Sequence, residues 1–443
     1  MHRALLPALL CLAACGRPAR GPWATDPDAP LALGETSVLW LLLCTVRADH
    51  TGPWGYDLPT TPTLDALADG GVRIRRTVPA GAWTRPSVAS QMTSLTPRTL
   101  GIDPPREHAF TDVYRVVPEA QTVAEWFDAA GYGTVGVSAN PNEHTFLGYG
   151  QGYDAFVDSD AMTGHRPDPE DKVPSRQVSD ELLGMIDALP EGEPFFGHAL
   201  YVGAHAPLGW WSYVPHPSLG FLGTPAQNYD RSIRRDDDEL ARLLDALEAR
   251  GRTRNLLVVI TSDHGEGVLR GEREGHGVPT YNAQSWILWM MAHPALPGGT
   301  EGQHPASGVD VLPTLADLLG GPAPDLTDGR SVRASWEAPE AFTPRPFEVT
   351  ETAFDGTLRA SVVDDTWRLV ATGEPPTRRE LYRWREDWLE QDDLAATEPE
   401  VVARMEGWLA AWRAEHPQRF DARLDQDLDD DARKQLEILG YVD

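Results

Sequence analysis

Short apolar runs alternate with longer amphipathic stretches from about residue 38 to about residue 320. Val38–Leu43 and Asn255–Thr261 are apolar at almost every position, which is typical of strands buried on both faces of a parallel sheet. Pro194–Val202 is a third such run, and Thr134–Ser138 is a shorter one. The alternation of these runs with helix-like segments predicts an α/β domain with a mostly parallel central sheet.

The segments between these runs carry helix signals. Tyr229–Ala249 is a long amphipathic stretch, and Pro62–Ala68 and Val311–Leu319 each stop at a pair of glycines, a common way for a helix to end. Pro86–Ser94 and Val123–Ala130 also favour helices. We therefore expect helices to flank the central sheet.

Beyond residue 325 the pattern changes to short strand-like runs and one helix. Three runs predict a small antiparallel sheet, and the amphipathic segment Glu398–Arg413 predicts a helix. Asp421–Asp431 is acidic and is most simply a solvated surface segment. The folded chain is thus divided into an α/β domain, residues 35–325, and a smaller C-terminal α+β subdomain, residues 326–443. The three strand-like runs that predict the antiparallel sheet are Glu348–Thr352, Ala360–Val363 and Trp367–Ala371.

The first residues of the chain have the pattern of a processed leader. Arg3 provides a positive charge, Ala4–Ala14 is an apolar stretch, and Cys15 follows directly. This order resembles the lipobox of bacterial lipoproteins, in which cleavage leaves a lipidated cysteine; the alternative is an ordinary secretory signal. The resemblance implies a signal peptide over residues 1–14, a flexible tether over 15–34, and an exported protein that Cys15 anchors to a bacterial membrane.

Charge and cysteine content each exclude one possibility. The chain of 443 residues has a formal net charge of -29, so it lacks the basic surface that a nucleic-acid partner requires. Its three cysteines are Cys11, Cys15 and Cys44. The first is removed with the leader and the second would carry lipid, so no internal disulfide is expected and Cys44 is a lone thiol.

Polar residues that could carry chemistry follow the ends of the predicted strands. Cys44 comes directly after the first run, and Asp263 and His264 follow the run that ends at Thr261. Ligands of doubly wound sheets gather beyond the carboxyl ends of the strands, and an oxygen donor beside an imidazole suits a divalent metal. The alternative is a turn capped by Asp263 with His264 exposed. His205 also lies just past a strand run.

A second candidate is the start of the helix near Pro86. Proline favours the first turn of a helix, so Thr84 is expected at or just before the helix N-terminus, where unpaired N–H groups and the helix dipole stabilise an anion. The alternative is that Thr84 is only an N-cap. His276, which lies between Gly275 and Gly277, could add a third polar group.

Taken in order, these segments resemble the sulfatase family of the alkaline phosphatase superfamily. The likeness extends from about Ser37 to Val442 and includes the stretches RADH, TRPS, HAP, VVITSDHGE, GHG, VDVLPTLADLLG, DGRS and ILGYV. The resemblance implies an alkaline phosphatase-like fold. It also implies that the protein binds a small anionic ester or an anionic glycan. The resemblance places Thr84 at the nucleophile position. It implies that the metal ligands are Asp263, His264 and Cys44. It also implies that four residues contact substrate, of which the two histidines are catalytic as well: Arg85, Ser87, His205 and His276.

The chain departs from the family pattern at positions that matter for mechanism. Thr84 stands where the family has Cys or Ser, Val88 where it has Arg, and Cys44 where it has a metal-binding Asp. Formylglycine is therefore not expected, and a phosphate ester is a better substrate than a sulfate ester. A thiolate binds Zn²⁺ well but suits Ca²⁺, Mg²⁺ and Mn²⁺ poorly. The expected cofactor is a divalent metal, Zn²⁺ or Mn²⁺ rather than Ca²⁺. The alternative function is a pseudoenzyme that binds an anionic glycan or partner at the cell surface.

Overall fold

The computed structural model describes residues 26–105, 113–163, 172–206, 208, 215–219 and 223–424. Cys15 and most of the acidic stretch Asp421–Asp431 lie outside these residues. Within them, every helix is too short or too polar to span a bilayer. The last part of the expected tether lies against the domain, because Ala29 is buried and the Leu33 N–H donates to the Leu319 carbonyl.

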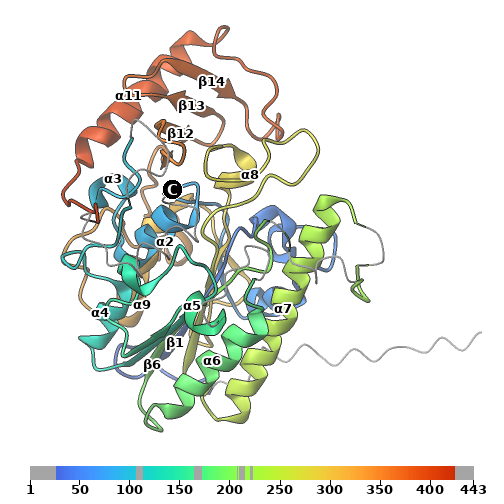
Figure 1. Ribbon diagram of the computed structural model, residues 1–443, viewed down its shortest axis with the longest axis vertical. Coiled ribbons are helices and arrows are strands. Elements are labelled where there is room, and N and C mark those ends of the chain that lie inside the picture. Colours follow the sequence, from blue (N-terminus) through green and yellow to red (C-terminus); the bar gives the residue numbers. More distant parts are fainter. Residues whose placement is uncertain are drawn as a thin grey trace, which may run out of the picture.

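An eight-stranded sheet forms the centre of the molecule (Figure 1). All strands run parallel except β8, which is antiparallel to both of its neighbours. The predicted α/β fold with a mostly parallel sheet is therefore confirmed. In spatial order the strands are β5 (Ala155–Val157), β4 (Gly133–Ser138), β6 (Phe195–Tyr201), β1 (Ser37–Leu43), β7 (Leu256–Thr261), β8 (Trp289–Ala292), β2 (Gly71–Ile74) and β9 (Thr300–Gly302).

Strand β1 lies in the middle of this sheet, between β6 and β7. Trp40 pairs with His198 on one side and with Val259 on the other. With a neighbour at each edge and helices on each face, every β1 residue except Ser37 is buried, which explains its uninterrupted apolar sequence.

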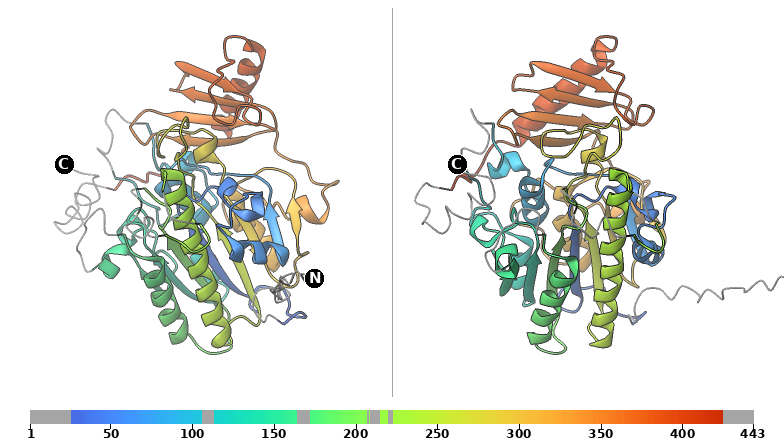
Figure 2. Two further views of the ribbon diagram at one scale, coloured as in Figure 1. Left: turned by 90° about the vertical axis from the view of Figure 1, so that its right-hand side faces the viewer. Right: turned by 45° about the vertical axis from the view of Figure 1, so that its right-hand side comes forward.

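Two helical layers enclose the sheet (Figure 2). The long helices α6 (Ser175–Ala188) and α7 (Pro225–Ala249) pack on one face together with α1 (Pro62–Asp69). Helices α2, α4 and α9 cover the other face; their bounds are Thr84–Thr93, Val123–Asp128 and Val311–Leu319. Short helices connect these layers: α3 (Pro97–Leu100), α5 (Ser159–Thr163), α8 (Asn282–Ser285) and α10 (Ala334–Glu337). The connections also contain a parallel pair of two-residue strands, β3 (Thr77–Val78) and β10 (Ala306–Ser307). The 3-10 turns are η1 (Ala48–His50), η2 (Gly52–Trp54), η3 (Thr145–Leu147) and η5 (Gly308–Asp310).

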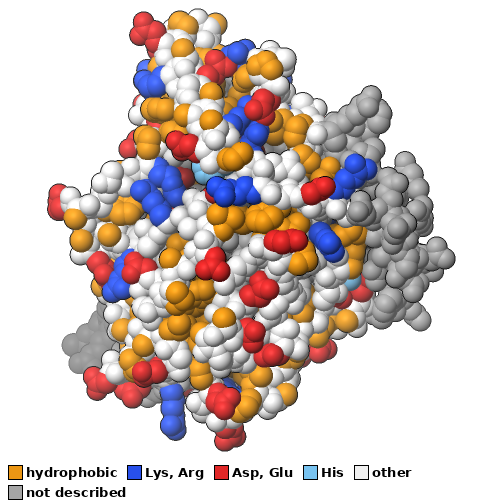
Figure 3. Space-filling view, turned by 90° about the vertical axis from the view of Figure 1, so that its left-hand side faces the viewer, with side chains coloured by type: hydrophobic (Ala, Val, Ile, Leu, Met, Phe, Trp, Pro, Cys, Tyr) orange, Lys and Arg blue, Asp and Glu red, His pale blue; other side chains and the backbone are white. Residues whose placement is uncertain are grey.

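A smaller subdomain sits at the top of the molecule in Figure 1 and in the space-filling view of Figure 3. It is a four-stranded antiparallel sheet with helix α11 packed on it, as the sequence predicts, and Leu369 and Met405 belong to its separate apolar core. The fourth strand was not predicted. The elements are β11 (Glu348–Thr352), β12 (Arg359–Val363), β13 (Arg368–Thr372), β14 (Arg378–Tyr382) and α11 (Pro399–Glu415).

Some element boundaries differ from the prediction. Helix α7 begins at Pro225 rather than Tyr229, because Thr224 and Gln227 form a capping box there. Helix α2 begins at Thr84, two residues before the predicted start at Pro86, so the proline occupies the third helical position instead of the first.

Candidate active site

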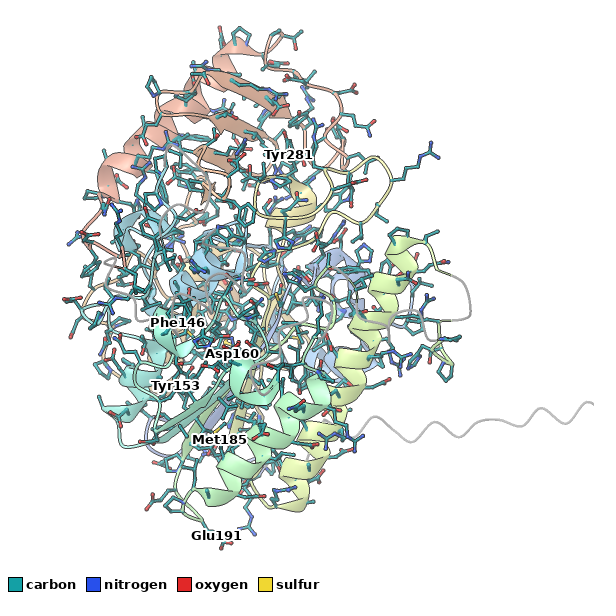
Figure 4. All side chains as sticks on the ribbon, viewed as in Figure 1. Phe146, Tyr153, Asp160, Met185, Glu191 and Tyr281 are labelled. Atoms are coloured by element: carbon teal, nitrogen blue, oxygen red, sulfur yellow. The ribbon has the colours of Figure 1, made fainter. Side chains whose placement is uncertain are left out.

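The candidate residues converge at the edge of the sheet where β1, β4, β6 and β7 end. In Figure 4 this edge faces upward, since Glu191, which precedes β6, marks the opposite end of the molecule. Leu42 on β1 pairs with Thr261 on β7. Cys44 and Asp263, each two residues further along, are therefore brought side by side by the register of the two strands.

Cys44, Asp263 and His264 form one buried cluster. The Cys44 Sγ lies 3.3 Å from Asp263 Oδ2, and His264 Nε2 lies 3.3 Å from the same oxygen. One ligand atom of each residue falls within 4.8 Å of those of the other two. Because His264 is fully buried, the alternative of an exposed histidine beside a capped turn is wrong.

The turn after β1 holds the Asp263 carboxylate in place. The Thr45 and His264 backbone N–H groups both donate to Asp263 Oδ1, each at 2.8 Å. Thr45 adopts a φ of 62°, a left-handed conformation that is unfavourable for a β-branched residue. The Tyr229 hydroxyl donates to the Thr45 carbonyl at 2.6 Å and holds this strained turn.

Thr84 lies against the same cluster. Its Oγ1 is 3.3 Å from His264 Nε2 and 3.6 Å from Cys44 Sγ. Thr84 is the first residue of α2, and the preceding Trp83 occupies the N-cap position. The alternative that Thr84 is only an N-cap is therefore wrong, and the predicted position at the helix N-terminus is confirmed.

Electrostatics in the cluster favour charges of opposite sign on Asp263 and His264. Burial opposes ionisation of the Asp263 carboxyl, but the His264 ring and the backbone N–H groups of Thr45 and His264 together lower its pKa. Burial likewise opposes charge on His264, and Asp263 raises its pKa. For Cys44, burial raises the pKa of the thiol well above its ordinary value and Asp263 raises it further. The thiol is therefore protonated unless a cation replaces its proton.

The donor atoms fit a thiophilic divalent metal. The His264 Nδ1 lies 3.0 Å from the Gly265 carbonyl oxygen, which can only accept, so Nδ1 is the donor. In the neutral ring Nε2 is then the atom with a lone pair, and it faces Asp263 and Thr84. One sulfur, one carboxylate oxygen and one imidazole nitrogen are a ligand set that Zn²⁺ accepts, whereas Ca²⁺ takes six or more oxygen ligands.

His205 and His276 extend the cluster outward. The His276 ring centroid lies 4.6 Å from that of His264 and 4.8 Å from that of His205. The Glu266 Oε2 hydrogen-bonds His276 Nδ1 at 2.9 Å and fixes the ring. Burial lowers the pKa of His205 well below its ordinary value, and the nearby His276 and Lys172 lower it further, so His205 is neutral at pH 7.

Arg85 and Ser87 flank Thr84 on α2 but differ in their contacts. The Arg85 guanidinium donates to Asn142 Oδ1 at 3.2 Å. Ser87 Oγ donates to the Asp263 carbonyl at 2.6 Å, which ties α2 to the end of β7. Val88 is fully buried in the apolar core. Substrate contact by Arg85 and Ser87 stays a prediction.

Asn140 is a member of the site that the motifs did not reveal. Its Nδ2 donates to Thr84 Oγ1 at 3.2 Å and to Cys44 Sγ at 3.3 Å. A signal existed, because Asn140 follows the predicted strand Thr134–Ser138 as Cys44 follows β1. Lys172, which donates to the His205 carbonyl, precedes α6 and gave no sequence signal.

Comparison with known proteins places the chain in a family. Residues 36–321 match the family model described as Sulfatase. The uncharacterized sulfatase YdeN of Escherichia coli is 25% identical over 307 residues, which covers 58% of this chain and 53% of YdeN. The chain thus spans about half the length of that curated relative.

Solved structures with the same fold are more distant in sequence. A phosphonate monoester hydrolase of Agrobacterium radiobacter superposes with a TM-score of 0.69 at 17% identity, over 86% of this chain and 96% of that one. A second protein, solved with its substrate D-glucosamine-2-N,6-O-disulfate, gives a TM-score of 0.68 at 15% identity, over 86% and 98%. These two likenesses show a shared fold.

Proposed function

The chain belongs to the sulfatase family, and on that premise we propose that it is a metal-dependent hydrolase or transferase of an anionic ester with Thr84 as its nucleophile. The observation that carries this proposal is the position of Thr84 Oγ1. It lies at the N-terminus of α2, within 3.6 Å of the Cys44 sulfur and 3.3 Å of His264 Nε2. A hydroxyl in this position is set to attack an anion bound at the helix N-terminus.

Cys44, Asp263 and His264 would hold the metal in this proposal, most favourably Zn²⁺. When bound, the ion supplies positive charge that lowers the cost of ionising the Thr84 hydroxyl and of the charge on the transferred group. The Asn140 amide donates to Thr84 Oγ1 at 3.2 Å, a hydrogen bond that strengthens as negative charge develops on that oxygen.

The identity of Thr84 favours a phosphate ester over a sulfate ester. Thr84 Oγ1 forms a bond to phosphorus while the bond from phosphorus to the leaving oxygen breaks, and the hydroxyl proton ends on the leaving alcohol. We assign the relay of that proton to His205 and His276, whose rings lie beside each other and, for His276, beside His264. Water or an alcohol then attacks the phosphothreonine and restores the hydroxyl. A sulfated threonine lacks the second hydroxyl through which a formylglycine hydrate expels sulfate by elimination.

The fold accommodates either class of ester. One protein of this fold is named a phosphonate monoester hydrolase and another was solved with a sulfated glucosamine as its substrate. A small anionic ester or an anionic glycan therefore suits the scaffold, and the nucleophile decides between phosphorus and sulfur.

Turnover by the metal-loaded protein tests this proposal. Purified protein is loaded with Zn²⁺ or Mn²⁺ and assayed with an aryl phosphate, an aryl phosphodiester and an aryl sulfate. We expect phosphate-ester cleavage that falls by about 10⁴-fold in Thr84→Ala. Activity equal to that of Thr84→Ala would contradict the proposal, and saturable anion binding without turnover would favour the pseudoenzyme alternative.

We also propose that the protein is exported and held at a bacterial membrane by lipid on Cys15. The support is the apolar stretch Ala4–Ala14 directly before that cysteine. We expect the full-length protein to sediment with membranes and Cys15→Ala to appear in the soluble exported fraction. Equal sedimentation of both would contradict a lipid anchor.

A further inference from the structure

A cavity of about 350 Å³ lies between the α/β domain and the C-terminal subdomain. Its walls come from Thr96 after α2, from Glu348 at the start of β11 and from Trp412 on α11. Exposed Ala411 and Glu415 also line it, so it opens to solvent. Thr84 occupies the opposite end of α2, so this cavity is separate from the candidate active site and large enough for a small ligand.

Two carboxylates of the cavity are only partly satisfied by the protein. Glu348 is 5% exposed. Among the described residues, the one side chain that hydrogen-bonds its carboxylate is Arg345, which reaches Oε1 at 3.5 Å. Asp328 accepts one hydrogen bond at Oδ2, from the Thr96 N–H at 2.8 Å. Each carboxylate therefore has an oxygen to which no described residue donates, within a cavity that also includes Glu415.

The single arginine of the cavity does not balance this negative charge. Arg345 forms a bidentate ion pair with Asp310, in which NH1 to Oδ2 is 2.6 Å and NH2 to Oδ1 is 2.8 Å. Asp310 is fully buried behind it. Asp310 neutralises Arg345, so the carboxylates of Asp328 and Glu415 give the cavity an excess of negative charge. Burial raises the pKa of Glu348 to about 7, although Arg345 and Arg330 act in the opposite direction, so this third carboxyl is partly ionised at pH 7 and a bound cation would favour its charged form.

Aromatic rings complete the walls. Phe347 and Trp412 both line the cavity. The Phe347 ring stacks on Trp408 with centroids 5.2 Å apart, and the Trp412 ring lies 4.7 Å from that of His416. These contacts hold the rings in place. Aromatic faces beside carboxylates attract organic cations, whose charge interacts with the ring as well as with the acid.

The arrangement does not suit a bare metal ion. The three carboxylates and His416 do not bring their ligand atoms together as a metal requires, since Cys44, Asp263 and His264 are the one such group in the described part of the chain. Carboxylates that are spread along an aromatic wall instead suit an organic cation, whose charged group can meet a carboxylate while its hydrocarbon part packs on the rings.

We propose that this cavity binds a small organic ammonium ion, an aliphatic amine whose charged nitrogen meets Glu348 and Asp328 while its methylene groups pack on Phe347 and Trp412. The net charge of -29 would draw such cations toward the protein. This site is independent of the proposed ester chemistry, so either proposal can fail without the other.

Calorimetric titration of the full protein with putrescine tests the proposal. Butanediol, its uncharged counterpart, and MgCl₂ are titrated in parallel. Ala411→Trp fills the mouth of the cavity from an exposed helix position, and Ala410→Trp places the same ring at the neighbouring exposed position outside it. Glu348→Gln removes one wall charge, with Glu386→Gln at a side chain that is 71% exposed as its control.

We expect one putrescine per chain with a Kd below about 1 mM. Affinity should fall about tenfold or more in Ala411→Trp and Glu348→Gln, and stay unchanged in Ala410→Trp and Glu386→Gln. Butanediol and MgCl₂ should not compete. Absence of saturable binding, or equal affinity in Ala411→Trp and Ala410→Trp, would overturn the proposal. That alanine pair decides the outcome even if Glu348→Gln does not fold.

Discussion

At the scale of single residues, a thiol among harder candidate ligands distinguishes this site. Cys44 Sγ lies 3.3 Å from Asp263 Oδ2 and accepts a hydrogen bond from Asn140 at 3.3 Å. Burial favours its protonated form, so a metal must displace that proton to bind. A metal that gains much from sulfur, as Zn²⁺ does, can meet this cost, whereas Ca²⁺ and Mg²⁺ cannot.

Replacement of Cys44 should therefore change metal preference. In Cys44→Asp the site offers two carboxylates and an imidazole, so we expect affinity for Mn²⁺ to rise about tenfold relative to that for Zn²⁺. Competition titration against a chelating dye measures both affinities. Cys44→Ser, similar in size but without the soft ligand, serves as the control and should lose Zn²⁺ affinity without gaining Mn²⁺. An unchanged Zn²⁺ to Mn²⁺ ratio in Cys44→Asp would show that the thiol is not a ligand.

Asn140 should matter for turnover more than for folding. Its amide donates to Thr84 Oγ1, the oxygen on which negative charge develops in the proposed reaction. We expect Asn140→Ala to lower kcat by about 10²-fold, with KM changed much less. Steady-state kinetics gives the two parameters separately, and thermal unfolding checks the fold. A change confined to KM would assign Asn140 to ground-state substrate binding instead.

At the scale of elements, side chains of α7 hold α1 in place. The Asp237 carboxylate accepts hydrogen bonds from the Thr63 and Leu64 N–H groups, at 2.9 Å and 3.0 Å. It thus caps the N-terminus of α1 from a neighbouring helix. Burial raises the pKa of Asp237 to about 7, although these hydrogen bonds act in the opposite direction.

This raised pKa predicts how stability changes with pH. Folded Asp237 holds its proton more tightly than the unfolded chain does, so its contribution is full at low pH and is lost as the pH rises from about 4 to about 7. Relative to Asp237→Asn, the free energy of unfolding of the wild type should fall by up to about 1.4 kcal/mol per pH unit in this window. Urea unfolding at several pH values measures the difference. Parallel curves for the two proteins would contradict the raised pKa.

The sequence revealed the elements whose patterns were long and regular. Val311–Leu319 matches α9 residue for residue, because its apolar periodicity is clear and Gly320 and Gly321 follow it directly. Strands β2 and β8 were missed since Gly71–Ile74 and Trp289–Ala292 are too short for a clear pattern. Asp263 and Cys44 were found from strand ends, whereas Lys172 reaches the site only through tertiary packing.

At the scale of the whole molecule, β11 links the C-terminal subdomain to loops of the candidate active site. The Glu351 N–H donates to the Ala80 carbonyl at 3.0 Å, just before the segment that leads to Thr84. The Thr352 hydroxyl donates to the Gly277 carbonyl at 2.7 Å, next to His276. Both loops that carry site residues are thus held by the C-terminal subdomain, so the subdomain is part of the scaffold of the site.

Glu351 should therefore support the stability of the entire chain. Its carboxylate is buried between Arg413 of α11 at 2.8 Å and Arg98 of α3 at 3.0 Å. Glu351→Gln leaves these guanidinium groups with only the more exposed carboxylate of Glu374 as a shared partner, and should lower the free energy of unfolding by up to about 3 kcal/mol. Glu406→Gln, at an exposed ion pair, should change it by less than about 1 kcal/mol. Urea unfolding followed by tryptophan fluorescence measures both variants and should show one transition for the whole chain. A separate transition at lower urea concentration would show that the C-terminal subdomain unfolds independently and would contradict this account.

The metal centre beside Thr84 is the central claim, and X-ray absorption of the zinc-loaded protein tests it most directly. We predict one Zn²⁺ per chain with a single sulfur neighbour at about 2.3 Å and nitrogen or oxygen neighbours at about 2.0–2.2 Å. The sulfur shell should disappear in Cys44→Asp, because Cys44 is the one cysteine among the described residues. A metal shell of nitrogen and oxygen alone in the wild type, or no stoichiometric zinc, would contradict the account.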